Sequence, residues 1–232
     1  MRKTLLLLVA LGMASGTALA QWTENFDSYA NGTVLNNVGG WFGWDNVPSA
    51  CGTVTNEQSF SSPHSMKIWN DDDAVHPFTG YTSGQWVFTC YQYIPSGLDK
   101  MTYFIINNLY NHGGPYEWAI ETHFDPATGY VFEALRDPNG TNKKPIVYNR
   151  WVEIKTVIDL TANQMQHYYN GQLLASGIWN VRGGPIAIAN VDLYAGAPTA
   201  PHQTPVYYDN FSLVPEPASI LLLLAAGLLR RR

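Results

Sequence analysis

The sequence predicts an all-β fold, an antiparallel β-sandwich or jelly roll, for residues 21–214. Segments rich in aromatic and β-branched side chains recur along this part of the chain, as is typical of strands. Turn-forming residues follow about every 8 to 15 positions, and no long helical period interrupts the series. Helices are expected only in two short apolar segments, one at each end of the chain.

The N-terminal segment, residues 1–20, has the pattern of a signal peptide. Arg2 and Lys3 give it a positive start, residues 5–14 are apolar, and Ala18-Leu19-Ala20 is a small-residue cleavage site before Gln21. We therefore expect a signal helix that directs export and is then removed.

The C-terminal segment, residues 215–232, is a short apolar run that ends in arginines. As a helix, residues 218–229 would span roughly 18 Å, against about 30 Å for the hydrocarbon layer of a bilayer. A helix this short and without a polar face fits neither a permanent span nor a core helix. The segment resembles the PEP-CTERM sorting signal of exported bacterial proteins. The residues that carry this resemblance are Pro215, Glu216, Pro217, Arg230, Arg231 and Arg232.

This resemblance implies a sorting pathway. It implies an exosortase as partner, a precursor that is transiently held in the inner membrane, and delivery to the cell surface or the extracellular matrix. The predicted organisation is therefore a signal peptide at 1–20, a β-sandwich domain at 21–214 and a sorting tail at 215–232.

The expected strands follow one another with recognisable turns between them. Asp125-Pro126-Ala127-Thr128-Gly129 has the residues of a turn between two strands, and Asn170-Gly171 marks a tight hairpin. The strands are expected at residues 85–94, 101–109, 117–124, 130–135, 151–160, 165–169, 172–175, 186–194 and 206–213.

The charge of the expected domain excludes one class of partner. The whole chain has 13 Lys and Arg against 18 Asp and Glu. Without the two terminal segments, 8 basic and 17 acidic side chains remain, a net charge of 8 − 17 = −9. Such an acidic surface, with no basic cluster, does not suit nucleic acid.

Two cysteines, Cys51 and Cys90, lie in the part that is expected to be exported. In an oxidising compartment we expect them to form a disulfide, which the loop-entropy model values at about 4 kcal/mol. The alternative is a pair of buried free thiols.

Several segments resemble concanavalin A-like lectin/glucanase domains. They are ENFDSYANGTVLNNVGGW, SSPHSMKI and QWVFTCYQYIP, followed by RWVEIKTVIDLTANQMQHYYNGQLL and PVYYDNFSL. The resemblance covers most of residues 25–213 and implies a jelly roll. Because this fold hosts lectins, glycosidases, polysaccharide lyases and non-catalytic modules, activity must be argued from a site.

The best catalytic candidate is the stretch EWAIETHFD, residues 117–125. Strand alternation predicts one polar face with Glu117, Ala119, Glu121, His123 and Asp125, and an opposite face with Trp118, Ile120, Thr122 and Phe124. Glucanases of the resembled class carry three acids at alternate positions, and Ala119 occupies the middle position here. Three interpretations stay open: a solvated face, a glycan contact, or catalysis by Glu117, Glu121 and His123.

A structural calcium site is a second candidate. Glu24 and Asp27 belong to the first expected strand and Asp209 to the last, and terminal strands of such sandwiches often pair. Carboxylate oxygens are ligands that calcium favours. The alternative is that Asp209 hydrogen-bonds loop backbone. Residues 70–73, Asn-Asp-Asp-Asp, are interpreted as a solvated loop.

Sugar binding needs flat aromatic side chains, and two loops offer them. Trp41 and Trp44 lie in one loop, and Tyr110 and Tyr116 lie near the other. For any one of them, core packing is the favoured interpretation. The sequence favours an exported, non-catalytic module that binds polysaccharide; the alternative is a polysaccharide-degrading glycosidase or lyase that uses the Glu117–His123 strand.

Overall fold

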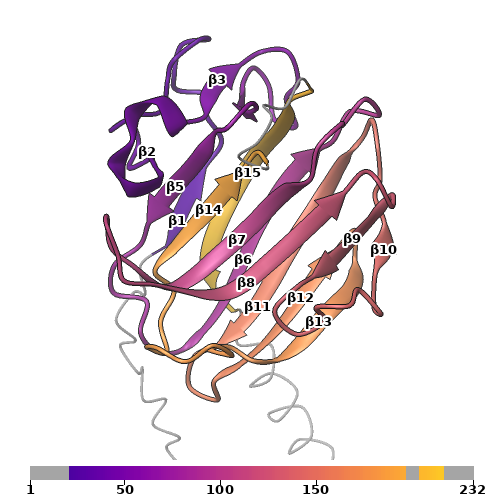
Figure 1. Cartoon of the computed structure of the whole chain (residues 1–232). Helices are drawn as coiled ribbons and strands as arrows, with labels where there is room; N and C mark the ends of the chain where they lie inside the picture. Colours follow the sequence, from indigo (N-terminus) through magenta and orange to yellow (C-terminus); the bar gives the residue numbers. More distant parts are fainter. Residues whose placement is uncertain (1–20, 197–203, 217–232) are drawn as a thin grey trace, which may run out of the picture.

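The protein is a sandwich of two antiparallel β-sheets packed face to face (Figure 1). The structure is a computed structural model that describes residues 21–196 and 204–216. In these residues the predicted all-β sandwich is confirmed. The signal and sorting helices were expected at positions outside the described residues.

The first sheet has eight strands. Its central strands β6 and β11 are nine residues long and pair along their whole length, from Trp151 opposite Tyr93 to Asp159 opposite Gln85. The strands, in spatial order, are β13 (Gln172–Ile178), β12 (Gln164–Tyr169), β11 (Trp151–Asp159), β6 (Gln85–Tyr93), β15 (Val206–Pro215), β4 (Ser65–Ile68) and β3 (Thr53–Thr55), with β1 (Trp22–Glu24) also pairing with β15.

The second sheet has seven strands and carries the candidate site. In spatial order they are β10 (Lys144–Pro145), β9 (Tyr130–Glu133), β8 (Tyr116–Asp125), β7 (Thr102–Tyr110), β14 (Asn190–Tyr194), β5 (Asp73–Pro77) and β2 (Phe42–Gly43). Two short 3-10 turns, η1 (Trp44–Asn46) and η2 (Pro48–Ala50), follow β2.

The core lies between the sheets and is built by strand alternation. Along β6, Trp86, Phe88 and Cys90 are buried, and the residues between them are more exposed. Phe104 of β7 meets Phe88 from the facing sheet, with ring centroids 5.8 Å apart. Burial of large apolar side chains at roughly 25 cal/mol per Å² provides the main stabilisation.

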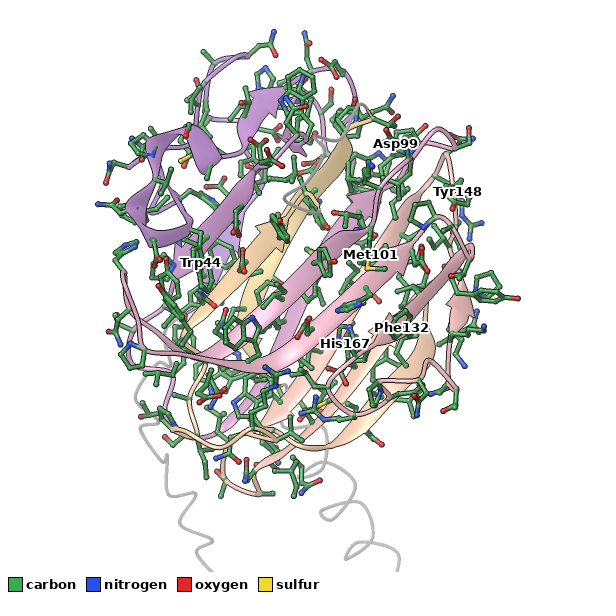
Figure 2. The ribbon with its side chains drawn as sticks, viewed as in Figure 1. Trp44, Asp99, Met101, Phe132, Tyr148 and His167 are labelled. Atoms are coloured by element: carbon green, nitrogen blue, oxygen red, sulfur yellow. The ribbon has the colours of Figure 1, made fainter. Side chains whose placement is uncertain are left out.

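His167 is a polar residue that is buried between the two sheets (Figure 2). Its Nε2 hydrogen-bonds the hydroxyl of Thr122 on β8 and its Nδ1 that of Thr156 on β11, each at 2.8 Å. Both ring nitrogens are thus satisfied, which a buried polar group requires. The imidazole links one sheet to the other by hydrogen bonds.

The last strand is longer than the sequence predicts. β15 continues through Val214 to Pro215, which lies opposite Trp86, and the N–H of Glu216 donates to the carbonyl of Gln85 at 2.9 Å. The strand therefore extends one residue, Pro215, into the segment assigned to the tail, and Glu216 adds a further hydrogen bond to β6. None of the helices in residues 21–196 and 204–216 is long and apolar enough to cross a membrane.

Candidate active site

A groove of about 450 Å³ lies on the outer face of the seven-stranded sheet. Phe104 and Ile106 of β7 point into the core, so the alternate residues Tyr103 and Ile105 face outwards into this groove. We call it the acidic groove. Its lining residues are Trp44, Asp73, Tyr103, Ile105, Tyr116, Trp118, Glu121, Asp192 and Tyr194.

Two carboxyl groups, Asp73 and Asp192, form a pair in the acidic groove. Asp73 lies opposite Tyr194, and Asp192 lies opposite Val75, so the two aspartates are diagonal neighbours on β5 and β14. Asp192 is only 2% exposed, and the Oδ1 atom of each aspartate has no hydrogen-bond partner among the other described groups. Two buried carboxyl groups in contact, without another donor, are stable together when they share a proton.

The electrostatics of the pair agree with a shared proton. Burial raises the pKa of Asp73 to about 6. Burial, and then the charge of Asp73, raises the pKa of Asp192 well above its usual range. The two groups titrate together, and both shifts favour the form of the pair that holds a proton.

A third carboxyl group in the acidic groove, that of Glu121, has the opposite tendency. His123 Nε2 lies 2.8 Å from Glu121 Oε1, and this hydrogen bond lowers the pKa of Glu121. The ring of His123 is held edge-on against Tyr103, with centroids 4.7 Å apart. The surroundings of Glu121 therefore favour its ionised form, in the same groove as a pair whose surroundings favour holding a proton.

The sheet register sets the spacing between these groups. Ile105 of β7 lies opposite Glu121 on one side and opposite Asp192 on the other. Neighbouring strands are about 4.8 Å apart, so the two Cα atoms are separated by roughly 10 Å across one intervening strand. Glu121 and Asp192 thus project from the same face with a gap between them that suits a sugar ring.

Aromatic rings form the two ends of the acidic groove. Trp44 packs against Tyr116, with centroids 4.7 Å apart, and is nearly parallel to Trp118 at 6.2 Å. On the other side, Tyr103 and Tyr194 are stacked at 5.3 Å. Figure 2 shows Trp44 at the β5 side of the sheet. Such flat surfaces suit the apolar faces of sugar rings.

Asp45 fixes the position of the Trp44 loop. It has a left-handed backbone (φ 52°, ψ 28°), which Asp tolerates better than most residues. Its carboxylate accepts hydrogen bonds from the hydroxyl of Tyr116 and from the N–H of Gly113, and its own N–H donates to the hydroxyl of Tyr110. The three contacts hold Trp44 beside β8.

Strand alternation assigns Trp118 to the wrong face. Ile106 lies opposite Ile120, but the next residue, Asn107, lies opposite Trp118, so Ala119 is the extra residue of a β-bulge. The bulge turns Trp118 onto the face of Glu121. The position that carries the middle acid in the resembled glucanases is therefore a bulge that reshapes the groove.

The other residues predicted to bind sugar have different places. Trp44 and Tyr116 line the acidic groove as expected, and Tyr110 supports their loop. Trp41 is fully buried and packs against Phe211 at 5.5 Å, so its assignment to a binding surface is wrong. Glu117 lies opposite Leu109 beyond the bulge and does not line the groove.

The structure gives the calcium candidates other partners. Glu24 accepts hydrogen bonds from the N–H of Phe26 and from the hydroxyl of Tyr29, and Asp27 accepts one from the N–H of His64. Asp209 accepts from the N–H groups of Phe60 and Ser61. Within the described part of the chain, no three His, Cys, Asp or Glu side chains form a group that could hold a metal ion. A hollow of about 640 Å³ lies beside Glu24.

Cys51 and Cys90 are free thiols, so the predicted disulfide is wrong. Cys90 points into the core from the middle of β6, opposite Ile154, and burial raises its pKa well above the usual range. Cys51 is 4% exposed, beyond η2, and its Sγ lies 3.7 Å from Oδ1 of Asn36. The alternative of two buried free thiols is the one that the structure shows.

Sequence reasoning missed several groove residues. Asp73, interpreted as part of a solvated loop, is the first residue of β5, and its neighbour Asp72 is 8% exposed. Asp192, Tyr103 and Tyr194 were covered by expected strands but were not singled out. An acid within a strand of otherwise apolar residues, as in NVDLY, is the signal that could have found Asp192.

Comparison with known proteins identifies the fold and no closer relative. No family model and no curated protein matches the chain. Among solved structures, it is similar to an alginate lyase, Aly36B, in complex with alginate tetrasaccharide (TM-score 0.55, 13% identity, 86% of this chain and 98% of that one). It is also similar to an endo-β-1,4-glucuronan lyase from Trichoderma reesei (TM-score 0.50, 12% identity, 82% and 96%).

Sialidases are similar over only part of their length. The Trypanosoma rangeli sialidase in complex with 2,3-difluorosialic acid gives a TM-score of 0.54 at 17% identity, over 83% of this chain but 30% of that one. The chain thus spans less than a third of that sialidase. At such identities these similarities establish a shared fold, and the chemistry has to be argued from the acidic groove.

The comparisons correct the expectation that the domain is non-catalytic. The three similar structures named above are a sialidase and two polysaccharide lyases, and the two lyases match over almost their whole length. The acidic groove also contains what a passive surface does not need, namely carboxyl groups whose pKa values are shifted in opposite directions.

Proposed function

We propose that the protein is a polysaccharide-degrading enzyme, a glycoside hydrolase that cuts a glycan chain lying in the acidic groove. The observation that carries this proposal is that one groove is lined by the Asp73–Asp192 pair, whose pKa values are raised, and by Glu121, whose pKa is lowered. Groups whose surroundings push their pKa values apart are the usual sign of an acid and a base with separate roles.

The chemistry of glycoside hydrolysis requires these two roles. A protonated carboxyl group gives its proton to the oxygen of the leaving sugar, and a carboxylate on the other side either attacks the sugar or activates a water molecule. The Asp73–Asp192 pair supplies the proton, and Glu121 supplies the carboxylate. His123 is a positioning residue that keeps Glu121 ionised through the 2.8 Å hydrogen bond.

Charge disfavours the lyase alternative. A lyase acting on a uronic acid has to neutralise the carboxylate of its substrate before it removes the neighbouring proton. Three carboxyl groups line the acidic groove, and its lining, within the described residues, includes neither Lys nor Arg. Hydrolysis of a glycan without acid groups suits this lining better.

The experiment is a product-release screen of the purified protein against neutral, basic and acidic polysaccharides. New reducing ends without unsaturated uronates are expected, and Glu121→Gln and Asp192→Asn should each abolish them. Glu117→Gln is the matched control, because this acid lies on the same strand but outside the groove. Circular dichroism of each variant verifies folding. Unsaturated products, or full activity of Glu121→Gln, would contradict the proposal.

We further propose that this enzyme is exported and sorted by an exosortase. The support comes from the sequence patterns of residues 1–20 and 215–232. Mass spectrometry of protein from the cell surface should give a chain that starts at Gln21 and lacks the terminal arginines. Recovery of the intact chain would contradict this proposal.

A further inference from the structure

The acidic groove has more negative charge than the proposed hydrolysis needs. Besides Glu121 and the Asp73–Asp192 pair, Asp45 lies close enough to raise the pKa of Asp73. Burial raises the pKa of Tyr194, and the charges of Asp73 and Asp192 add to this rise. Burial also raises the pKa of Tyr103, and the charge of Glu121 adds to that rise. One ionised and one proton-bearing group would suffice for general acid and base catalysis.

This charge has little compensation from the chain itself. No Lys or Arg in the described residues lines the acidic groove. The basic side chains closest to it lie on its Glu121 side: the hydrogen bond from His123 lowers the pKa of Glu121, and the charge of Arg182 adds to this shift. At the other side, Oδ1 of Asp73 and Oδ1 of Asp192 have no hydrogen bond to any described donor. Asp192 is buried and faces the groove, so a cation bound there would give its unpaired Oδ1 an electrostatic partner.

The aromatic walls suit the same kind of group. An ammonium is attracted to the faces of Trp and Tyr rings, and aromatic rings combined with carboxylates are the usual means of recognising it. The chain itself provides an example, because the guanidinium of Arg182 lies over the ring of Trp118 at 5.7 Å. Tyr103 and Tyr194 are stacked beside the aspartate pair, and no Lys or Arg of the described residues lies over their rings.

We infer that the substrate of the acidic groove is a glycan of amino sugars whose amines are free and protonated. This inference rests on the proposed function, because it names the substrate class of the same site. An ammonium on one sugar ring would lie against the Asp73–Asp192 pair, with the ring itself beside Tyr103 and Tyr194. A uronate polymer would bring carboxylates to the same place and be repelled.

The test compares two hexasaccharides that differ only in charge. One is a β-1,4-linked glucosamine hexamer, and the other is its fully N-acetylated form, with the same backbone and linkage. Binding to the purified protein is measured by isothermal titration calorimetry at mildly acidic pH, using the inactive Glu121→Gln variant so that no cleavage occurs. We expect the amine form to bind at least 10-fold more tightly at low salt, and the difference to shrink as salt screens the charges.

Variants of the aspartate pair give a second, independent readout. Asp73→Asn in the same background should remove the preference for the amine form. Glu153→Gln, which removes a charge from β11 in the other sheet, should keep it.

The outcomes separate this inference from the proposed function. Equal or tighter binding of the N-acetylated hexamer, or of a hexuronate, would overturn the inference, and release of products from neutral glycans would still support hydrolysis. Preferential binding of the amine form supports the inference even if the wild-type protein releases no product from it, which would contradict the hydrolase proposal alone.

Discussion

Glu121 and His123 lie two residues apart on the same face of β8, and their side chains are joined by a 2.8 Å hydrogen bond. Both side chains are about one fifth exposed, at 23% and 19%. Glu121 lines the acidic groove and His123 lies beside it, and solvent screens both side chains only in part. The hydrogen bond to His123 lowers the pKa of Glu121.

The first prediction concerns this pair. In His123→Asn the hydrogen bond that favours the ionised carboxylate is weakened, so the pKa of Glu121 should rise. The acid limb of the pH profile of kcat/KM should therefore move to higher pH, with a smaller change at its plateau. The measurement is kcat/KM against pH for both proteins. An unchanged acid limb would show that His123 does not hold Glu121 ionised.

The second prediction concerns stability and the aspartate pair. The folded-state pKa values of Asp73 and Asp192 are raised, so folded protein holds more protons than unfolded protein above about pH 4. Their contribution to stability is therefore lost as pH rises through about 6 and beyond. In Asp192→Asn this loss should be smaller, as measured by urea unfolding at several pH values. Burial also raises the pKa values of Asp72 and Asp209, and these two residues are present in the wild-type protein and in the variant alike.

The third prediction concerns His167, whose effect on stability has the opposite pH dependence. Burial lowers the pKa of His167 to about 3, so below about pH 6.5 the unfolded chain binds a proton that the folded protein does not. Stability should decrease as pH falls through this window, by up to about 1.4 kcal/mol per pH unit from this residue. His167→Gln should flatten that dependence. An identical slope in both proteins would contradict the buried neutral imidazole.

The fourth prediction contrasts two tryptophans that are three residues apart. Trp41 is fully buried, so Trp41→Ala should destabilise the fold by about 3–5 kcal/mol. Trp44 lines the acidic groove, so Trp44→Ala should weaken glycan binding with a smaller loss of stability. Thermal unfolding and affinity electrophoresis on the same pair of variants measure both effects. A reversed pattern would place the binding surface elsewhere.

The fifth prediction concerns the cysteines. Unfolded but unreduced protein should react with two equivalents of an alkylating agent, because Cys51 and Cys90 are free thiols. Folded protein should react slowly, since both are buried. Intact mass after alkylation is the measurement. A mass two units below the reduced form, with no alkylation, would indicate a disulfide instead.

The regular strands could be predicted from the sequence because their patterns are local. The stretch QWVFTCYQYI alternates and ends at a proline, and β6 occupies it almost residue for residue. Short strands such as β2 and β10 could not be found, because two residues have no period. They are strands only because a neighbouring strand provides hydrogen bonds.

The groove was harder to predict because it is assembled across strands. Glu121 and His123 could be selected from one strand by alternation alone. Asp73 and Asp192 are 119 positions apart (192 − 73) and meet only through the pairing of β5 with β14. The bulge at Ala119 is set by the partner strand β7, so no alternation rule could place Trp118 correctly. Likewise, the number of cysteines could not reveal that one of them points into the core.

The pairing of β1 with β15 has a mechanical consequence. Trp22 lies opposite Leu213 in an antiparallel pair, so the first and last strands leave the sheet beside each other. A pulling force applied to the two ends would load these hydrogen bonds one after another, starting at Trp22, rather than all at once. Unzipping of this kind needs little force, so β1 should peel away while the sheet that carries the groove still holds its shape.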